Sequence, residues 1–118
     1  MLKNRSLRFA ALLAVSLGLA PSAFAAAERP QSDKPYVFET VDSYLIVDDN
    51  RVEVTGILQG ESAPRTFVFR GTVSTAGAQF SRCDRMALLS MSKPGLYLFT
   101  MVQAPETWMA STCQLTRR

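Results

Sequence analysis

Two cysteines, Cys83 and Cys113, are the residues whose chemistry is easiest to infer from the sequence. Two thiolates are too few for a four-cysteine zinc site, and their spacing is not that of a Cys-x-x-Cys redox pair. We expect them to form one structural disulfide that joins the start of a helix to the last strand. The alternative is a reactive thiol at Cys83, where a first helical turn would favour the thiolate.

The chain contains no histidine, which removes the commonest general base and the commonest metal ligand. A serine nucleophile would then need a lysine base, and only Lys34 and Lys93 follow residue 25. Lys34 lies in a polar segment near two prolines, and Lys93 lies in a turn that ends a predicted helix. We therefore expect a protein that is not an enzyme, with no catalytic residue, no metal and no cofactor.

Carboxylates cluster at Asp48, Asp49 and Glu53. Paired carboxylates can perform acid–base hydrolysis of glycosides, and several together can bind calcium. Adjacent acidic residues followed by Asn50 are more often turn formers, because Asp and Asn side chains bond their own backbone. The twelve-residue calcium-loop pattern is absent, so the turn is the favoured interpretation.

The first 25 residues have the three parts of a secretory signal peptide. A positive start precedes an apolar run at 9–20, and the run is too short for a comfortable membrane span of roughly 20 residues. Small residues at Ala23 and Ala25 predict cleavage after Ala25. We expect a periplasmic or secreted protein with no stable membrane span after cleavage, and a retained anchor is the alternative.

Cleavage would remove three of the 13 basic residues and none of the 10 acidic ones, so the remaining chain carries no net charge. The argument from charge for nucleic-acid binding therefore fails, since a phosphate backbone requires a basic surface. The remaining charge is uneven, with acidic residues in excess at 26–61 and basic residues in excess at 62–118. Either the two halves neutralise each other side by side, which we favour, or they form a dipolar surface that binds an acidic partner.

After the signal peptide, we predict a flexible leader at 26–35 and a single small domain at 36–118. Residues 36–38 and 44–47 are β-branched and aromatic, and Asp42 with Ser43 marks either a bend in one strand or a break between two. A turn at 48–50 follows. Gly56 relieves crowding or marks a bulge in the next strand. The further strands are expected at 51–58, 66–70, 96–102 and 112–116.

One helix is expected at 81–92, because this stretch contains no β-branched residue and several strong helix formers. Ser81 and Asp84 have the spacing of a capping box, and the sequence from Lys93 through Gly95 ends the helix. A strand buried on both faces is the alternative.

The resulting order β-β-β-α-β-β, within an α+β or mostly β class, resembles that of the OB-fold, a five-stranded barrel with one helix. The resemblance covers about residues 36–117 and is one of element order. A small open antiparallel sheet with one helix on its face fits the same order.

The OB-like arrangement implies a binding face between the 48–50 turn and the loop at 104–111. Trp108 lies in that loop, and the cations expected near the face are Arg51, Arg65 and Arg70. Packing of Trp108 into the core is the commoner role for such a residue. The candidate ligand-binding residues are Trp108, Asp48, Asp49, Arg51, Arg65 and Arg70.

These observations predict a non-catalytic binding module of the bacterial envelope, with an unidentified protein or envelope polymer as its partner. A structural or inhibitory periplasmic protein is the alternative, and a small hydrolase is the weakest hypothesis because the usual catalytic groups are missing.

Overall fold

The protein was analysed as a computed structural model that describes residues 26–71, 76–106 and 108–118. The predicted signal peptide lies outside the described residues. Seven elements follow in order: β1 (Pro35–Phe38), β2 (Ser43–Asp48), β3 (Arg51–Gly56), β4 (Arg65–Arg70), α2 (Ala76–Ser92), β5 (Tyr97–Val102) and β6 (Thr112–Arg117). No helix in the described part of the chain is long and apolar enough to cross a membrane.

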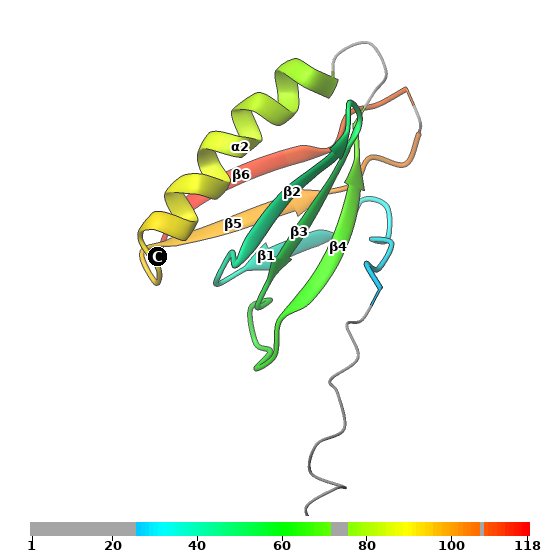
Figure 1. The fold of residues 1–118 in the computed structure, drawn as a ribbon. Coiled ribbons are helices and arrows are strands. Elements are labelled where there is room, and N and C mark those ends of the chain that lie inside the picture. The colour runs from blue at the N-terminus through cyan, green and yellow to red at the C-terminus, as the bar shows by residue number, and fades with distance from the viewer. Residues whose placement is uncertain (1–25, 72–75, 107) are drawn as a thin grey trace, which may run out of the picture.

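The strands form two antiparallel sheets of three strands each, in the orders β2-β3-β4 and β1-β5-β6. Figure 1 shows the helix α2 lying along β6 and β5, with the β2-β3-β4 sheet beside it. The mostly β class with one helix is confirmed. The closed five-stranded barrel is wrong, because the strands are divided between two sheets.

The break between β1 and β2 explains why the barrel does not form. The chain leaves β1 at Phe38 and enters β2 at Ser43, and the two strands join different sheets. The Thr40 hydroxyl oxygen accepts a hydrogen bond from the Ile57 amide at 3.0 Å, and the Asp42 amide donates to the Thr55 carbonyl at 2.7 Å. Of the two sequence interpretations of this region, the break is correct.

An aromatic core fills the space between the sheets. Alternate residues of β3 and β4 point inward, as the two-residue period of a strand requires. Four phenylalanine rings are almost fully buried: Phe38, Phe67, Phe69 and Phe99. The ring centroids of Tyr36 and Phe67 lie 4.5 Å apart. Burial of each such ring contributes about 1.5–3 kcal/mol, so this cluster is the main source of cohesion between the sheets.

Gly56 lies where the backbone of β3 passes close to the backbone at Thr40. A Cβ atom at this position would overlap the Thr40 carbonyl oxygen and lie 3.1 Å from Cδ1 of Phe38. Relief of crowding is therefore the role of this glycine, and the register of β3 with β4 runs through it without a shift.

The helix starts five residues before the predicted boundary, at Ala76. The capping box at Ser81 and Asp84 is therefore wrong, because both residues lie inside the helix. The added turn contains Ala76 and Ala78, and alanine is the best helix former. The predicted end is confirmed: α2 stops at Ser92, and Gly95 has a φ of 83°.

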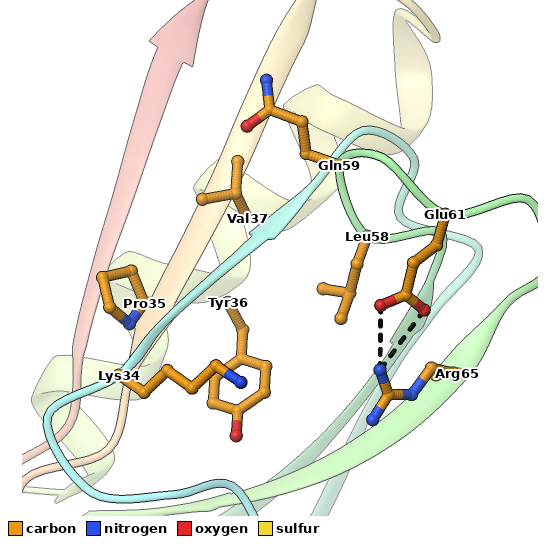
Figure 2. Close-up of a pocket in the computed structure, with 8 residues that line it drawn as sticks. All are labelled: Lys34, Pro35, Tyr36, Val37, Leu58, Gln59, Glu61 and Arg65. Atoms are coloured by element: carbon orange, nitrogen blue, oxygen red, sulfur yellow. Dashed lines mark hydrogen bonds and ion pairs between the residues drawn. The ribbon is translucent and has the colours of Figure 1, made fainter.

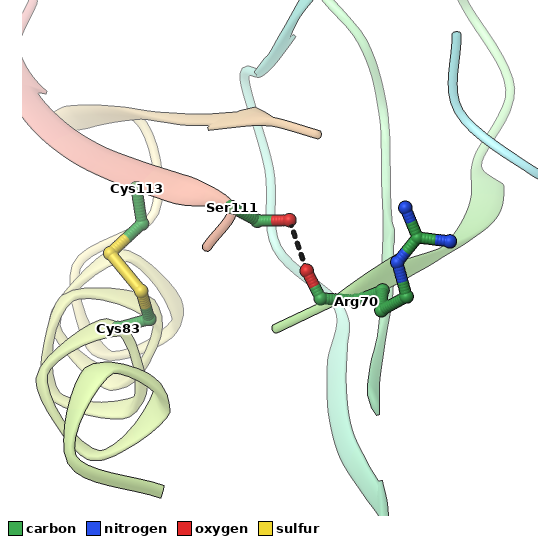
Figure 3. Close-up of a disulfide and its surroundings, with 4 residues drawn as sticks. All are labelled: Arg70, Cys83, Ser111 and Cys113. Carbon is green, nitrogen blue, oxygen red and sulfur yellow. Dashed lines mark hydrogen bonds between the residues drawn. A yellow bond between two sulfur atoms is a disulfide. The ribbon is translucent and has the colours of Figure 1, made fainter. Parts of the chain in front are cut away.

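The disulfide between Cys83 and Cys113 is present and links α2 to β6 (Figure 3). Cys83 is fully buried, together with Ala87 and Ser90 on the same side of the helix. No free cysteine remains. The bond therefore fixes the buried face of α2 against the β1-β5-β6 sheet.

The predicted leader makes backbone contacts with both sheets. The Glu28 amide donates to the Thr66 carbonyl at 2.8 Å, and the Val68 amide donates back to Glu28 at 3.0 Å. Ser32 forms a parallel bridge with Gln103. Residues 28–33 thus continue the outer edge of β4 and cross to the end of β5.

Replacing both cysteines by serine is expected to lower the free energy of unfolding by about 3–4 kcal/mol, because a closed loop of this length loses chain entropy in the unfolded state. Urea unfolding of the oxidised protein and of the double variant measures the difference. Addition of a reductant should destabilise the parent protein to the same extent and leave the variant unchanged. Equal stability of the oxidised protein and the variant would contradict the prediction.

Gly56→Ala is expected to destabilise the fold by about 3 kcal/mol or more, because the added methyl group meets backbone that cannot move independently. Gly60→Ala is the matched control. Gly60 has open space around its Cβ position and a φ of 84°, so alanine there should cost only about 1–2 kcal/mol of backbone strain. Thermal unfolding of the two variants measures their loss of stability. A smaller loss of stability for Gly56→Ala than for Gly60→Ala would refute the crowding argument.

Candidate functional site

The predicted site residues fall into two places rather than one. Arg51 and Arg70 lie side by side at one end of β3 and β4, next to the turn that carries Asp48 and Asp49. Arg65 lies at the opposite end of β4, and its side chain is on the other face of that sheet, where it covers the Phe67 ring at 4.8 Å. The structure thus brings together Arg51, Arg70, Asp48 and Asp49 and separates Arg65 from them.

Arg51 and Arg70 are direct cross-strand partners on the outer face of the β2-β3-β4 sheet. Like charges placed directly opposite each other in a sheet are destabilising. Arg51 is relieved in part by Asp48, to which it donates from Nε at 2.8 Å and from a terminal nitrogen at 2.6 Å. Arg70 forms no ion pair with any described residue, and its Nε is buried without a hydrogen-bond partner among them.

Hydrogen bonds hold both the backbone amide and the backbone carbonyl of Arg70. The Gln103 side-chain oxygen accepts the Arg70 amide at 2.8 Å, while its nitrogen donates to the Arg70 carbonyl at 3.3 Å. The Ser111 hydroxyl donates to the same carbonyl (Figure 3). Gln103 and Ser111 lie at the two ends of the loop between β5 and β6, so both ends of that loop are fixed to Arg70.

A cavity of about 320 Å³, here called the basic pocket, lies over this part of the sheet. It is lined by three cations and no carboxylate; the lining residues are Arg29, Pro30, Ser32, Arg51, Val68, Arg70 and Gln103. Residues 29–32 form one wall because the bridge at Glu28 directs the Glu28 side chain to Arg65 and leaves Arg29 over the outer face. The predicted leader therefore contributes to the site.

Asp48 and Asp49 form the turn between β2 and β3. The Asp48 carboxylate accepts the Asn50 amide at 3.1 Å as well as the Arg51 guanidinium, and these bonds hold the pKa of Asp48 below its usual range, with the bond from Arg51 the larger cause. The turn interpretation is therefore correct for Asp48. Within the described residues, no three or more His, Cys, Asp or Glu side chains gather closely enough to hold a metal ion.

Arg65 is part of a second cavity of about 220 Å³, lined also by Lys34, Tyr36 and Glu61 (Figure 2). Its guanidinium donates to both carboxylate oxygens of Glu28 at 2.9 Å and to Glu61 at 2.9 Å. The two carboxylates raise the pKa of Arg65, with the bond to Glu28 the largest cause. This guanidinium is neutralised by its neighbours, so Arg65 is a structural cation here.

The ion pairs also show how the acidic and basic halves of the sequence meet. Three of the four pairs formed by described residues join one half to the other, two of them at Arg65 and one between Arg118 and Glu39. At Arg65 and Arg118 the two halves do neutralise each other side by side, as the interpretation we favoured expects.

Trp108 is 73% exposed, so the expectation that it packs into the core is wrong. The loop that carries it is fixed at both ends to Arg70, as described above, and Figure 1 shows this loop at the same end of the molecule as the turn between β2 and β3. The Gly71 amide donates to the Asn50 carbonyl at 2.7 Å and holds the end of β4 to that turn. An exposed aromatic residue and a basic pocket thus share one end of the protein.

One buried titratable pair lies elsewhere, between β2 and α2. Burial, and then the neighbouring Asp84 carboxyl, raise the pKa of the Tyr44 hydroxyl far above its usual range. Tyr44 therefore stays protonated at neutral pH and does not act as a base or a nucleophile.

Five of the seven lining residues of the basic pocket were not predicted from the sequence, and three of these are polar: Arg29, Ser32 and Gln103. Arg29 and Ser32 lie in a segment whose two prolines indicated a leader. Gln103 had a usable signal, because a polar residue that ends an apolar strand must satisfy its side-chain amide when it is buried.

Comparisons of the chain with protein-family models, with curated proteins and with solved structures find no match. The argument for function therefore rests on the residues and geometry described above.

Replacing Glu28 by glutamine is expected to loosen the 28–33 segment from β4 and to remove a pH dependence. The Arg65 guanidinium lowers the pKa of Glu28, so the carboxylate stabilises this contact at neutral pH, and the contribution is lost as the pH falls below about 4.5. Hydrogen exchange of the Glu28 and Val68 amides, which close the bridge, reports the change. Exchange that is unaffected by the substitution would contradict it, and Glu106→Gln, at an exposed position in the β5–β6 loop, is the control.

Proposed function

We propose that this protein is a non-catalytic binding module of the bacterial envelope that holds an anionic polymer against the basic pocket and the Trp108 loop. The observation that carries the proposal is the lining of the pocket by three arginines without a carboxylate. A pocket lined by charges of one sign is suited to a ligand of the opposite sign.

The exposed Trp108 supplies the second component of such a site. An exposed indole ring offers a large apolar surface on which the C–H face of a sugar ring or a flat apolar group can pack. Because both ends of its loop are bonded to Arg70, the loop that carries the ring is anchored beside the pocket. Such preorganisation favours binding, since less freedom is lost when the ligand arrives.

The chemistry of the pocket favours binding over catalysis. Arginine stays protonated at all ordinary pH values and cannot act as a general base. The remaining polar lining, Ser32 and the Gln103 amide, contains no partner that would activate a nucleophile. Export to an oxidising compartment, inferred from the first 25 residues, is consistent with the Cys83–Cys113 bond.

A different observation favours the alternative, a structural or inhibitory protein that contacts other proteins. β2 is an edge strand, and its consecutive residues Leu45, Ile46 and Val47 are 52%, 55% and 40% exposed. Exposed apolar edge strands can pair with a strand of another chain. This alternative gains support only if the anionic-polymer test below fails.

Titration of the purified protein with dextran sulfate, with neutral dextran as the uncharged comparison, tests the proposal. Trp108 is the only tryptophan, so its fluorescence reports the loop directly. We expect a blue shift and protection from a soluble quencher with dextran sulfate alone. Trp108→Ala is expected to weaken binding about tenfold, measured by calorimetry, which corresponds to about 1.4 kcal/mol.

Leu88→Ala is the matched control, because Leu88 is equally exposed but lies on α2, away from the pocket. It should bind dextran sulfate as the parent does. Binding that is unchanged in the Trp108 variant, or equally weakened in the Leu88 variant, would overturn the proposed face.

A further inference from the structure

We propose that the basic pocket is a site for a phosphomonoester dianion carried on a small polar group such as a sugar. This inference rests on the proposed function, because it names the charged group that the same face accepts. It is carried by three features of the pocket: its charge, the unpaired nitrogen of Arg70, and its size.

The charge of the pocket matches a dianion. Arg51 shares its charge with Asp48, whereas neither Arg29 nor Arg70 forms an ion pair with any described residue. Two uncompensated guanidinium groups therefore face the cavity. A phosphomonoester carries a charge of about −1.5 to −2 at neutral pH, so one such group neutralises both, whereas a single carboxylate would leave one unbalanced.

The side chain of Arg70 has a donor that the protein leaves unused. Its Nε is buried and has no hydrogen-bond partner among the described residues. Glu53, the carboxylate diagonal to Arg70 on the same face of the sheet, forms no ion pair with it. The two terminal nitrogens of the Arg70 guanidinium likewise form no ion pair with described residues. They present the two-pronged donor pattern that phosphate oxygens accept, which a point charge such as lysine cannot reproduce.

The backbone from which that side chain extends is held in place. Gln103 bonds both the amide and the carbonyl of Arg70, so Gln103 is a positioning residue rather than a ligand of the anion. Ser32 adds a hydroxyl to the lining, and Val68 adds an apolar surface. The volume of about 320 Å³ lies at the lower end of the range for small-ligand sites, which leaves room for a polar carrier beside the phosphate.

The first experiment follows the arginine Nε–H signals by NMR in protein purified after expression of the full chain. Glucose 6-phosphate and inorganic phosphate are each added up to about 10 mM, with succinate as a dicarboxylate comparison. The Arg70 Nε–H signal should shift with both phosphates and stay in place with succinate. A shift with succinate but not with phosphate would overturn the assignment of ligand class.

Variants separate the site from general attraction by positive charge. Arg70→Lys retains the charge but loses the forked donor, and it should bind glucose 6-phosphate at least fivefold more weakly. Arg29→Gln should weaken binding about tenfold, and because Arg29 is exposed this variant tests the pocket even if Arg70 variants fold poorly. Arg117→Gln, at the end of the sheet opposite Gln103, is the control and should bind within twofold of the parent. Equal weakening by Arg117→Gln would overturn the proposal.

Two further comparisons separate the source of the group and the fate of the two proposals. Phosphorylated dextran that binds more tightly than glucose 6-phosphate, at equal phosphate concentration, would identify a polymer-borne phosphate, and equal binding would identify a free small molecule. Phosphate binding without any effect of dextran sulfate on Trp108 would refute the polymer function alone. The converse result would refute the phosphate site alone.

Discussion

The backbone amide and carbonyl of Arg70 bond the end of the β2-β3-β4 sheet to the end of the β1-β5-β6 sheet. Gln103, at the end of β5, exchanges two hydrogen bonds with them, as a neighbouring strand would. The side-chain amide of Gln103 thus takes the place of a backbone partner and ends the hydrogen-bond ladder at Arg70. The buried polar group is satisfied, and the Arg70 side chain is left on the outer face with a fixed origin.

The functional contrast between the two ends of β4 follows from this arrangement. At one end, Arg65 lies on the core side and is met by Glu28 and Glu61, so its charge serves to fasten residues 28–33 to the sheet. At the other end, Arg70 faces Arg51 across the strands, and no carboxylate reaches it. Because strand alternation decides the face and sequence position decides the end, two arginines five residues apart acquire opposite roles.

Local chemistry was the part of the structure that the sequence predicted well. The disulfide, the turn at Asp48 and the end of the helix at Ser92 each depend on the residues within a few positions or on a single pair. The division into two sheets was not predictable in this way. It depends on whether residues 39–42 continue a strand, which is decided by the contact of Thr40 with Ile57 and Gly56, distant in sequence.

The candidate site shows the same limit more sharply. The sequence analysis placed Arg51, Arg65 and Arg70 near one face through the OB-like arrangement, whereas the pairing of β3 with β4 brings only Arg51 and Arg70 together. The exposure of Trp108 and the presence of Arg29 were not predictable, because each depends on where a loop or a terminal segment lies against the finished sheets. Proline and small polar residues indicate irregular backbone, but they carry no information about its contacts.

The disulfide connects this site to the rest of the protein. Cys113 follows Ser111 by two residues, so the strand that leaves the Trp108 loop is held to Arg70 by a hydrogen bond and to α2 by a covalent bond. The other end of the loop is held by Gln103. A loop fixed at both ends has fewer conformations to lose on binding, so the bond that stabilises the fold also reduces the entropic cost of using the exposed tryptophan. The stability of the domain and the readiness of the proposed binding face therefore involve the same pair of cysteines.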